Sequence, residues 1–465
     1  MADASYSPRL RTAVLLCGTG TAGVYQAGVL RALAESGVKI DVVAGHGPGA
    51  ANALAAAIDG GHRLWDDSGP WTATSLGRAY RWRPALRVLF FGLLVASILL
   101  LSPLLVLIVA ALLYALAMLA ALVNLSGVSE GLVTAYLRLV EILFNPPVLP
   151  TIVPRAVVLA MLIVLAVLVV SAVRALAHDR SRRRFRGGFW WRLVGTPLGA
   201  DEPGGGLTSA LWSLVRGASA APEPDLETMG RRYIEVLADN LGQPGFREVL
   251  VAVHDLDARR DLVGALLAPG GRGRFEARRT GGGPREAETV DFTGPERQLV
   301  VDFLEAGLRL PIATPAWAVT LPADGYWRGE RHHWCDRPEL SARLLDEIAN
   351  LGVAQVVLVG AAPQAAVPHG LRARPADLRS RIGAEVRSVE TAVFDELSIA
   401  ATGRFAAAFV IRPAHNPVGP FDFGGVYDEG SDRRVSLAEL MKHGVSDAYR
   451  QFIEPVVAAG ERIET

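Results

Sequence analysis

A long uncharged hydrophobic run, Val88–Ser129, dominates the pattern of apolar and polar positions along the chain. Its 42 residues include no Asp, Glu, Lys, Arg or His. As one helix the run would be about 63 Å long at 1.5 Å per residue, roughly twice the ~30 Å hydrocarbon core of a bilayer. We therefore expect a helical hairpin whose turn lies near Ser102-Pro103 or near Ala110-Ala111.

A second apolar run, Ala156–Val173, is bordered by an arginine on each side. Its 18 residues would form roughly 27 Å of helix, which is enough for one crossing. Between the two runs, Gly131–Phe144 carries Arg138 and Glu141 among apolar residues. We expect this segment to be an interfacial or bundle-facing helix that stops at Pro146-Pro147.

Arginine clusters on both borders predict which side of the membrane the ends of the insert occupy. Because such clusters stay on the cytoplasmic side, both ends should be cytoplasmic and the number of crossings even. Four crossings result if the middle segment also crosses, and two if one run is re-entrant. Trp82, Trp190 and Trp191 stand where interfacial aromatic residues belong. The arginines concerned are Arg78, Arg81, Arg83 and Arg87 before the insert, and Arg174, Arg180, Arg182, Arg183, Arg184, Arg186 and Arg192 after it.

The remaining sequence alternates between strand-like and helix-like patterns, which is typical of a parallel sheet covered by helices. Apolar runs expected to be buried strands lie at Thr12–Cys17, Ile40–Ala44, Val249–Val253, Val353–Val359 and Phe405–Ile411. Helical periodicity covers Val24–Ser36, Ala50–Ile58, Met229–Leu241, Leu340–Leu351 and Ser436–Phe452. Glycine-rich and charged stretches at Ala200–Gly206 and Ala268–Glu288 predict mobile, solvated loops.

These patterns predict one α/β domain interrupted by a transmembrane helical insertion. Neither side of the insert has enough strands for a stable sheet, so we expect the two sides to pair. The expected division is residues 1–75 for the first part of the α/β domain, 76–195 for the transmembrane or interfacial insertion, and 196–465 for the second part.

Composition narrows the classes of partner and site. Lys plus Arg and Asp plus Glu balance at 47 each, which gives no reason to expect nucleic acid as a partner, and the apolar share of 51% is high for a wholly soluble protein. The two cysteines, Cys17 and Cys335, suggest reduced thiols in a cytosolic domain. His332-His333 lies near Cys335, but no group at metal-ligand spacing accompanies it, so we expect neither a metal nor a cofactor.

A glycine motif, Gly18-x-Gly20-x-x-Gly23, directly follows the first strand. One interpretation is the phosphate loop of a dinucleotide-binding fold, which also needs an acidic residue at the end of the second strand. Here the second strand ends in Ala44-Gly45, with Asp41 near its start. The other interpretation is an oxyanion hole, in which Gly18, Gly20 and Gly23 would expose backbone N–H groups to a developing negative oxygen.

The turn after the second strand favours the oxyanion interpretation. A strand that enters Gly-x-Ser-x-Gly and leaves as a helix is a nucleophile elbow, where the glycines permit a strained turn that presents the serine. Gly45-His46-Gly47-Pro48-Gly49 has both flanking glycines at this spacing, but Gly47 occupies the serine position.

Over about fifty residues these features resemble the patatin-like phospholipase family in order and spacing. The resemblance runs through the glycine loop, Gly28-Val29-Leu30 and Asp41–Gly45, then Gly49-Ala50 and Asn52-Ala53. Looser resemblances occur at Pro311–Pro315 and at Arg337-Pro338, so that the similarity spans roughly 10–65 and 230–460. It implies a lipid acyl hydrolase with a Ser-Asp pair, in which the glycine loop holds the oxyanion.

Three positions depart from the family pattern. Gly47 has no side chain to attack an ester, and Ala22 stands where the family usually has Arg or Lys. The Asp-Gly-Gly/Ala motif is not intact. Family spacing leads to Glu330-Arg331-His332, while a gap would allow Asp324-Gly325 or Asp336, of which Asp336 is preferred.

The departures favour a membrane-anchored pseudo-enzyme whose soluble domain is cytoplasmic and which binds membrane lipid or a protein partner through a retained pocket. The alternative is an active lipid acyl hydrolase with an unconventional nucleophile or an activated water, for which His46 could serve as base. Cys17 could attack in principle, but its place at the end of a strand favours a core role. A nucleotide-binding oxidoreductase is the least favoured reading.

Overall fold

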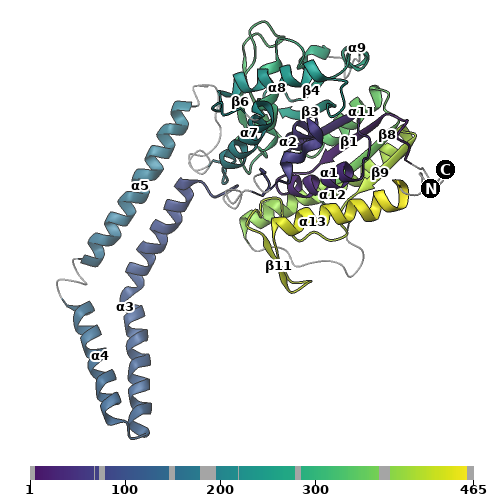
Figure 1. Cartoon of the computed structure of the whole chain (residues 1–465). Helices are drawn as coiled ribbons and strands as arrows, with labels where there is room; N and C mark the ends of the chain where they lie inside the picture. Colours follow the sequence, from purple (N-terminus) through teal and green to yellow (C-terminus); the bar gives the residue numbers. More distant parts are fainter. Residues whose placement is uncertain are drawn as a thin grey trace. The chain divides into compact units, whose positions relative to one another are not determined.

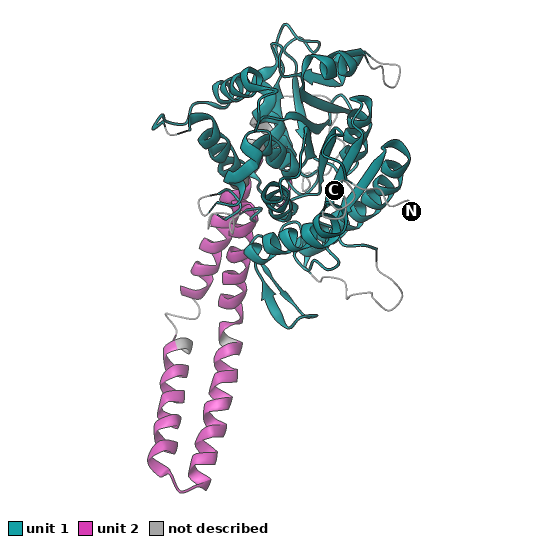
Figure 2. Ribbon diagram, turned by 45° about the vertical axis from the view of Figure 1, so that its right-hand side comes forward, with its two compact units in different colours: residues 1–81, 198–465 teal, residues 82–197 magenta. Residues whose placement is uncertain are grey.

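The computed structural model describes residues 6–66, 69–72, 79–145, 152–178, 195–217, 219–277, 284–365 and 377–457. The chain divides into two compact units (Figure 2). Unit 1 consists of residues 1–81 and 198–465, and unit 2 of residues 82–197.

Unit 1 is built on a mixed but mostly parallel sheet with the strand order β5-β4-β3-β2-β1-β8-β9, and β6 and β7 extend it from β3. This confirms the α/β class predicted from the alternating pattern. The strands are β1 (Thr12–Cys17), β2 (Val42–His46), β3 (Glu248–Asp255), β4 (Arg260–Leu266), β5 (Thr289–Asp291), β6 (Trp317–Thr320), β7 (Arg331–Cys335), β8 (Gln355–Gly360) and β9 (Ala407–Ile411), with a separate hairpin of β10 (Val426–Asp428) and β11 (Arg433–Val435).

Strands from both sides of the insert share this sheet. β1 pairs in parallel with β2 on one side and with β8 on the other, so that Leu15 lies opposite both Ala44 and Leu358. β2 continues in parallel to β3, where Ala44 lies opposite Leu250. The carboxyl ends of β1 and β2, which carry the two glycine motifs, therefore lie at the same edge of the sheet.

Helices cover both faces of the sheet (Figure 1). α11 and α12 bury Leu344 and Phe394 against Leu15 and Leu250 on one face, and α2 packs on the other. The helices of unit 1 are α1 (Ala22–Glu35), α2 (Pro48–Ala56), α7 (Asp201–Arg216), α8 (Leu226–Asn240), α9 (Pro269–Ala277), α10 (Val300–Gly307), α11 (Leu340–Asn350), α12 (Leu378–Arg404) and α13 (Leu437–Ala448), with shorter or irregular turns at Asp59–Leu64, Arg285–Ala287, Arg297–Leu299 and Tyr449–Val457.

The two stretches predicted as solvated loops contain helices instead. α7 begins inside the first stretch, and its later residues Leu207, Leu211 and Trp212 are buried. α9 lies within the second, where Phe275 is buried. Tertiary burial of these apolar residues outweighs the weak local preference of the glycines for helix.

Unit 2 is helical and consists of α3 (Pro84–Leu122), α4 (Ser126–Phe144) and α5 (Val153–His178). The turn predicted at residues 102–103 or 110–111 is wrong, because α3 continues through both places for 39 residues, about 58 Å. The chain reverses at 123–125 instead, and α4 and α5 both run back along α3 (Figure 1). Inside α3, Ser102 donates its hydroxyl to the carbonyl of Leu99 at 2.7 Å, which keeps this side chain bonded within the helix.

Close helix packing in unit 2 uses small residues. A Cβ at Gly92 of α3 would lie 2.2 Å from a methyl carbon of Val164 on α5, so only glycine permits this approach. Ala96, Ala110 and Ala117 are buried on α3, whereas Phe90, Leu100 and Leu112 are among the many large apolar side chains that are exposed. Exposed apolar surface of this extent is typical of contact with lipid or a partner.

Three helical segments are long and apolar enough to cross a membrane by length and composition: Pro84–Ser102, Leu104–Leu122 and Val153–Val173. The helix predicted at Gly131–Phe144 is present as part of α4, which begins earlier, at Ser126. Pro146-Pro147, Trp190, Trp191, Arg78 and the arginines from 180 to 192 lie outside the described residues.

Candidate functional site

The elbow after β2 has the backbone of a strained turn. Gly47 lies between β2 and α2 with φ 60° and ψ −140°, a region that is essentially restricted to glycine. A Cβ at Gly45 would lie 2.2 Å from the carbonyl oxygen of Gly49, so the turn itself requires that glycine. The sequence Gly-x-Gly-x-Gly therefore folds as a tight strand-to-helix turn, with Pro48 at the first position of the helix.

Asp336 lies directly beside the elbow. A Cβ at position 47 would be 2.7 Å from Oδ2 of Asp336 and 2.7 Å from the carbonyl oxygen of Gly18. Asp336 follows the last residue of β7, and its backbone N–H donates to the carbonyl of Arg309 at 2.7 Å. Of the acidic candidates left open by the sequence, Asp336 is the one whose carboxylate adjoins Gly47.

The other candidates lie in different surroundings. Asp324 lies near Glu296. Burial, together with the negative charges of Asp324 and Asp291, raises the pKa of Glu296 to about 7. His332, at the place given by family spacing, pairs its Nδ1 with a carboxylate oxygen of Asp255 at 2.5 Å.

His46 and Asp336 form a buried pair. Nδ1 of His46 is 2.9 Å from Oδ1 of Asp336, and their side chains are 1% and 0% exposed. Burial opposes a charge on His46, but the carboxylate of Asp336 outweighs it and raises the histidine pKa to about 10. Burial raises the pKa of Asp336, and His46 counteracts part of that rise. Within the described chain, Nε2 of His46 and Oδ2 of Asp336 have no hydrogen-bond partner.

This pair predicts that unit 1 loses stability as the pH rises. Between the unfolded pKa of His46, near 6.5, and the folded value of about 10, only the folded chain holds the imidazole proton. Its stabilisation is complete below pH ~6.5 and declines through this window, by at most about 1.4 kcal/mol per pH unit. The raised pKa of Asp336 acts in the same direction at lower pH. Denaturant unfolding at a series of pH values should show this slope, and His46→Gln should flatten it; an unchanged slope in the variant would contradict the assignment.

The glycine loop after β1 is covered by residues 416–425, here called the closing segment. The backbone N–H of Thr21 donates to the carbonyl of Pro420 at 3.0 Å, and its hydroxyl donates to the carbonyl of Gly419 at 2.9 Å. A Cβ at Gly20 would overlap the Pro420 carbonyl oxygen, and one at Gly23 would overlap the ring of Trp71. At Gly18 a Cβ would lie 2.8 Å from Cβ of Ala22, and the φ of +124° itself favours glycine. Close packing thus constrains all three glycines predicted to form an oxyanion hole.

Two arginines of α12 hold the closing segment in place. Arg387 donates to the carbonyls of Asn416 and Val418, and Arg379 donates to the carbonyl of Phe421. Tyr80 packs against Phe421 with ring centroids 5.2 Å apart, and its hydroxyl donates to the carbonyl of Leu308. The carboxyl edge of the sheet is therefore covered by side chains and backbone from distant parts of unit 1.

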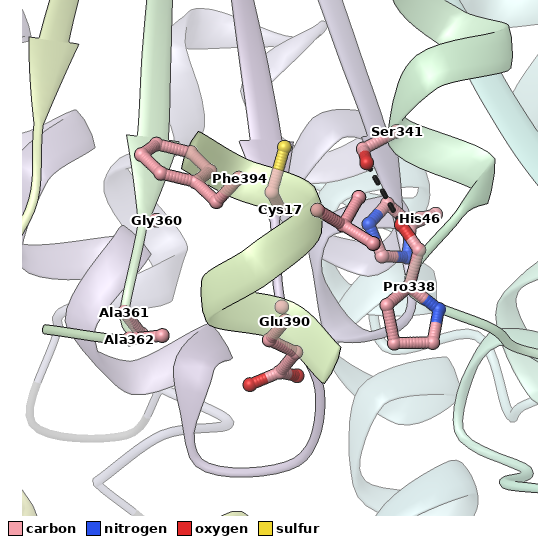
Figure 3. Close-up of a pocket in the computed structure, with 11 residues that line it drawn as sticks. Cys17, His46, Pro338, Ser341, Gly360, Ala361, Ala362, Glu390 and Phe394 are labelled. Atoms are coloured by element: carbon pink, nitrogen blue, oxygen red, sulfur yellow. Dashed lines mark hydrogen bonds between the residues drawn. The ribbon is translucent and has the colours of Figure 1, made fainter. Parts of the chain in front are cut away.

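The hollow that remains at this edge has a volume of only about 10 Å³ (Figure 3). Cys17, His46 and Glu390 come to it from β1, β2 and α12, and Glu390 accepts a hydrogen bond from the hydroxyl of Thr19. Burial raises the pKa of Glu390 and that of the Cys17 thiol, although His46 lowers the latter in part. A hollow of this volume holds about one water molecule, whereas ligand pockets are about 300–1,000 Å³.

Sequence reasoning missed Glu390, Tyr80 and the closing segment as parts of this site. Glu390 lies on α12, for which no helix was predicted, and nothing in its local sequence distinguishes it from a surface glutamate. No role in the site was predicted for the closing segment. The only available signal was its density of glycine, proline and aromatic residues, which is typical of an ordered loop that packs closely.

His333 and Cys335, the other histidine and cysteine singled out in the sequence, lie outside this site. His333 pairs with Asp257 at 2.8 Å on the exposed side of β7, while Cys335 is buried. In the part of the chain that the structure describes, no group of three His, Cys, Asp or Glu side chains is arranged to hold a metal ion.

No protein-family model matches the chain, and no curated protein sequence matches it significantly. Among solved structures, the crystal structure of VipD from Legionella pneumophila is similar with a TM-score of 0.30 and 12% sequence identity, over 98% of this chain and 68% of that one. A likeness at this level supports no functional argument, so the function has to be argued from the residues.

Proposed function

We propose that this chain is a membrane-associated, patatin-like α/β protein of the phospholipase type that has lost ester hydrolysis. In this proposal the helices of unit 2 contact membrane lipid, and unit 1 is a pseudo-enzyme. The sequence resemblance at the glycine loop and elbow supports the family assignment, together with the strand-to-helix turn at Gly47 and the carboxylate beside it.

One observation carries the loss of hydrolysis: the space that a serine at position 47 needs is occupied. Oδ2 of Asp336 and the carbonyl of Gly18 both lie 2.7 Å from the Cβ position. The N–H of Thr21 already has the carbonyl of Pro420 as acceptor, so it is not free for a substrate oxyanion. The hollow of about 10 Å³ is too small for an acyl chain, so lipid contact is assigned to α3 and α5 instead of to a retained pocket.

A second candidate is hydrolysis by a water molecule that His46 activates. The favourable observation is that Nε2 of His46 is buried, has no hydrogen-bond partner among the residues that the structure describes, and lines a hollow the size of one water. The closing segment would have to leave the edge of the sheet before an ester could reach that water. This requirement makes hydrolysis the less favoured candidate. So does the pKa of His46, raised to about 10, because a protonated imidazole cannot accept a proton from water near pH 7.

The pseudo-enzyme proposal predicts no turnover of fluorogenic short-chain esters or of phospholipids by the purified full-length chain in detergent. Loss of a nucleophile costs such enzymes many orders of magnitude in rate. A working serine lipase in the same detergent serves as positive control, and the heat-denatured chain sets the background. Hydrolysis above that background that disappears in His46→Ala would refute the proposal and establish the water mechanism.

We further propose that the chain is an integral membrane protein with unit 1 on the cytoplasmic side. Support comes from the arginines that border the apolar runs. Cys17 and Cys335 are buried, so Arg231→Cys on α8 would place one accessible thiol on unit 1. We expect a membrane-impermeant maleimide to label it in inside-out vesicles and to leave it unlabelled in sealed right-side-out vesicles. The reverse labelling would place unit 1 on the other side of the membrane.

A further inference from the structure

A groove of about 740 Å³ lies at the amino edge of the sheet, opposite the edge that carries the elbow. Arg11, Lys39 and Arg247 line it immediately before or near the starts of β1, β2 and β3, and Arg274 lines it from α9. Its volume falls within the range of about 300–1,000 Å³ that is typical of small-molecule sites. No role in the proposed pseudo-enzyme has been assigned to this groove.

The lining of the groove is positively charged. Four cationic side chains face two carboxylates, Asp41 and Glu248, so the lining carries a net charge of +2. The carboxylate of Asp59, outside the lining, also acts electrostatically on Arg247. Arg11 pairs with Glu248, and Lys39 pairs with Asp41 at 3.1 Å. Neither Arg247 nor Arg274 forms an ion pair with any residue that the structure describes.

Backbone carbonyls hold the arginines in fixed positions. Arg247 donates from Nε to Ile40 at 3.2 Å and from Nη1 to Ala56 at 2.8 Å. Arg11 and Arg274 both donate from Nη1 to the carbonyl of Leu351 at the end of α11, at 2.8 and 2.9 Å. Because carbonyls orient the guanidinium groups of Arg247 and Arg274 without forming an ion pair with them, an anion can bind there at little cost in side-chain entropy.

We propose that this groove binds a phosphate-bearing anion. Arginine presents several N–H donors in a planar fork that matches phosphate oxygens, and Lys39 adds a mobile charge at the rim, where its side chain is 48% exposed. The phosphate belongs either to a free small molecule or to a phospholipid headgroup, and the experiment below separates these sources. The inference does not depend on the proposed loss of hydrolysis.

The test is calorimetric titration of inorganic pyrophosphate into the full-length chain in phosphatidylcholine nanodiscs. We expect saturable binding with a dissociation constant below about 1 mM that weakens as salt is added. Lys39→Gln combined with Arg274→Gln removes two charges from the groove and should weaken binding at least about tenfold, or about 1.4 kcal/mol. The matched control combines Arg31→Gln and Arg231→Gln, which removes two half-exposed charges from α1 and α8.

The second arm repeats the titration in nanodiscs that also contain phosphatidate. If the native chain loses pyrophosphate binding in these discs, and the change depends on an intact groove, the occupant is a lipid headgroup. Unchanged binding identifies a free phosphate compound. No saturable binding of pyrophosphate to the folded chain, or equal weakening in the control variant, would overturn the proposal. Tryptophan fluorescence of each variant before titration verifies that unit 1 is folded.

Discussion

Replacing His46 with Leu is expected to lower the free energy of unfolding of unit 1 by about 3–5 kcal/mol, the usual cost of removing one partner from a buried ion pair. The substitution leaves the carboxylate of Asp336 fully buried. Its Oδ2 has no hydrogen-bond partner within the described part of the chain, and its Oδ1 loses the Nδ1 of His46. Guanidinium-induced unfolding of the detergent-solubilised full-length chain, followed by tryptophan fluorescence, measures the loss.

Two further variants separate lost charge pairing from lost packing. Asp336→Asn removes the charge and keeps a hydrogen-bonding group opposite His46, so it should cost only about 1–2 kcal/mol. The combination of His46→Leu and Asp336→Asn should be more stable than His46→Leu alone, because no buried carboxylate remains. If His46→Leu lowered the stability by less than Asp336→Asn, the pair would not be the buried charge interaction described above.

Restoring the missing hydroxyl with Gly47→Ser is expected to destabilise unit 1 by about 2–5 kcal/mol and to produce no esterase activity. Two costs add: the backbone at φ 60° and ψ −140° disfavours any side chain, and the new Cβ would lie 2.7 Å from a backbone oxygen that cannot easily move. Denaturant unfolding and an assay with fluorogenic esters measure the two effects on the same preparation.

Gly37→Ala provides the matched control for this variant. Gly37 also has a positive φ, +66°, but a Cβ there would meet nothing within 4 Å. It should cost only the backbone term, about 1 kcal/mol. If the Gly47→Ser chain were as stable as the native chain and hydrolysed esters, the elbow would still accept a nucleophile. The loss of activity would then be due to a single missing side chain and not to a closed site.

The local elements near the amino terminus were predictable because their patterns are strong and continuous. Thr12–Cys17 matches β1, and the two helices that follow the glycine motifs begin two residues earlier than predicted. The second strand is Val42–His46, later than the predicted Ile40–Ala44. The shift occurs because parallel pairing to β1 and β3 continues through Gly45, and to β3 through His46, although neither residue favours strands.

Elements that depend on distant contacts were not predictable in the same way. β4 pairs antiparallel with β3, although its sequence alternates poorly, and α12 was not expected at all. Its face toward the core contains only scattered apolar residues such as Phe394 and Leu397. The long α3 also escaped prediction, because the thickness of a bilayer argues for a turn that the intrahelical hydrogen bonds do not require.

The same division applies to the candidate site. The glycine spacing around Gly47 was sufficient to predict an elbow and the absence of a nucleophile. The identity of the neighbouring acid was not fixed by spacing, since Asp336 lies 289 positions further along the chain and adjoins Gly47 only through the sheet. The occupation of the glycine loop by Pro420 is a contact between residues about 400 positions apart, and no local pattern reports it.

The bonds that α12 makes to two segments of the site determine how the site can open. Its Glu390 is bonded to Thr19 of the glycine loop, and its Arg379 and Arg387 are bonded to the closing segment. A single helix thus holds both the glycine loop and the closing segment that covers it. Because both segments are bonded to α12, neither should move independently of the other. We therefore expect the site to open as one cooperative unit. Amide protons of the glycine loop and of the closing segment should then exchange with solvent in a single concerted event.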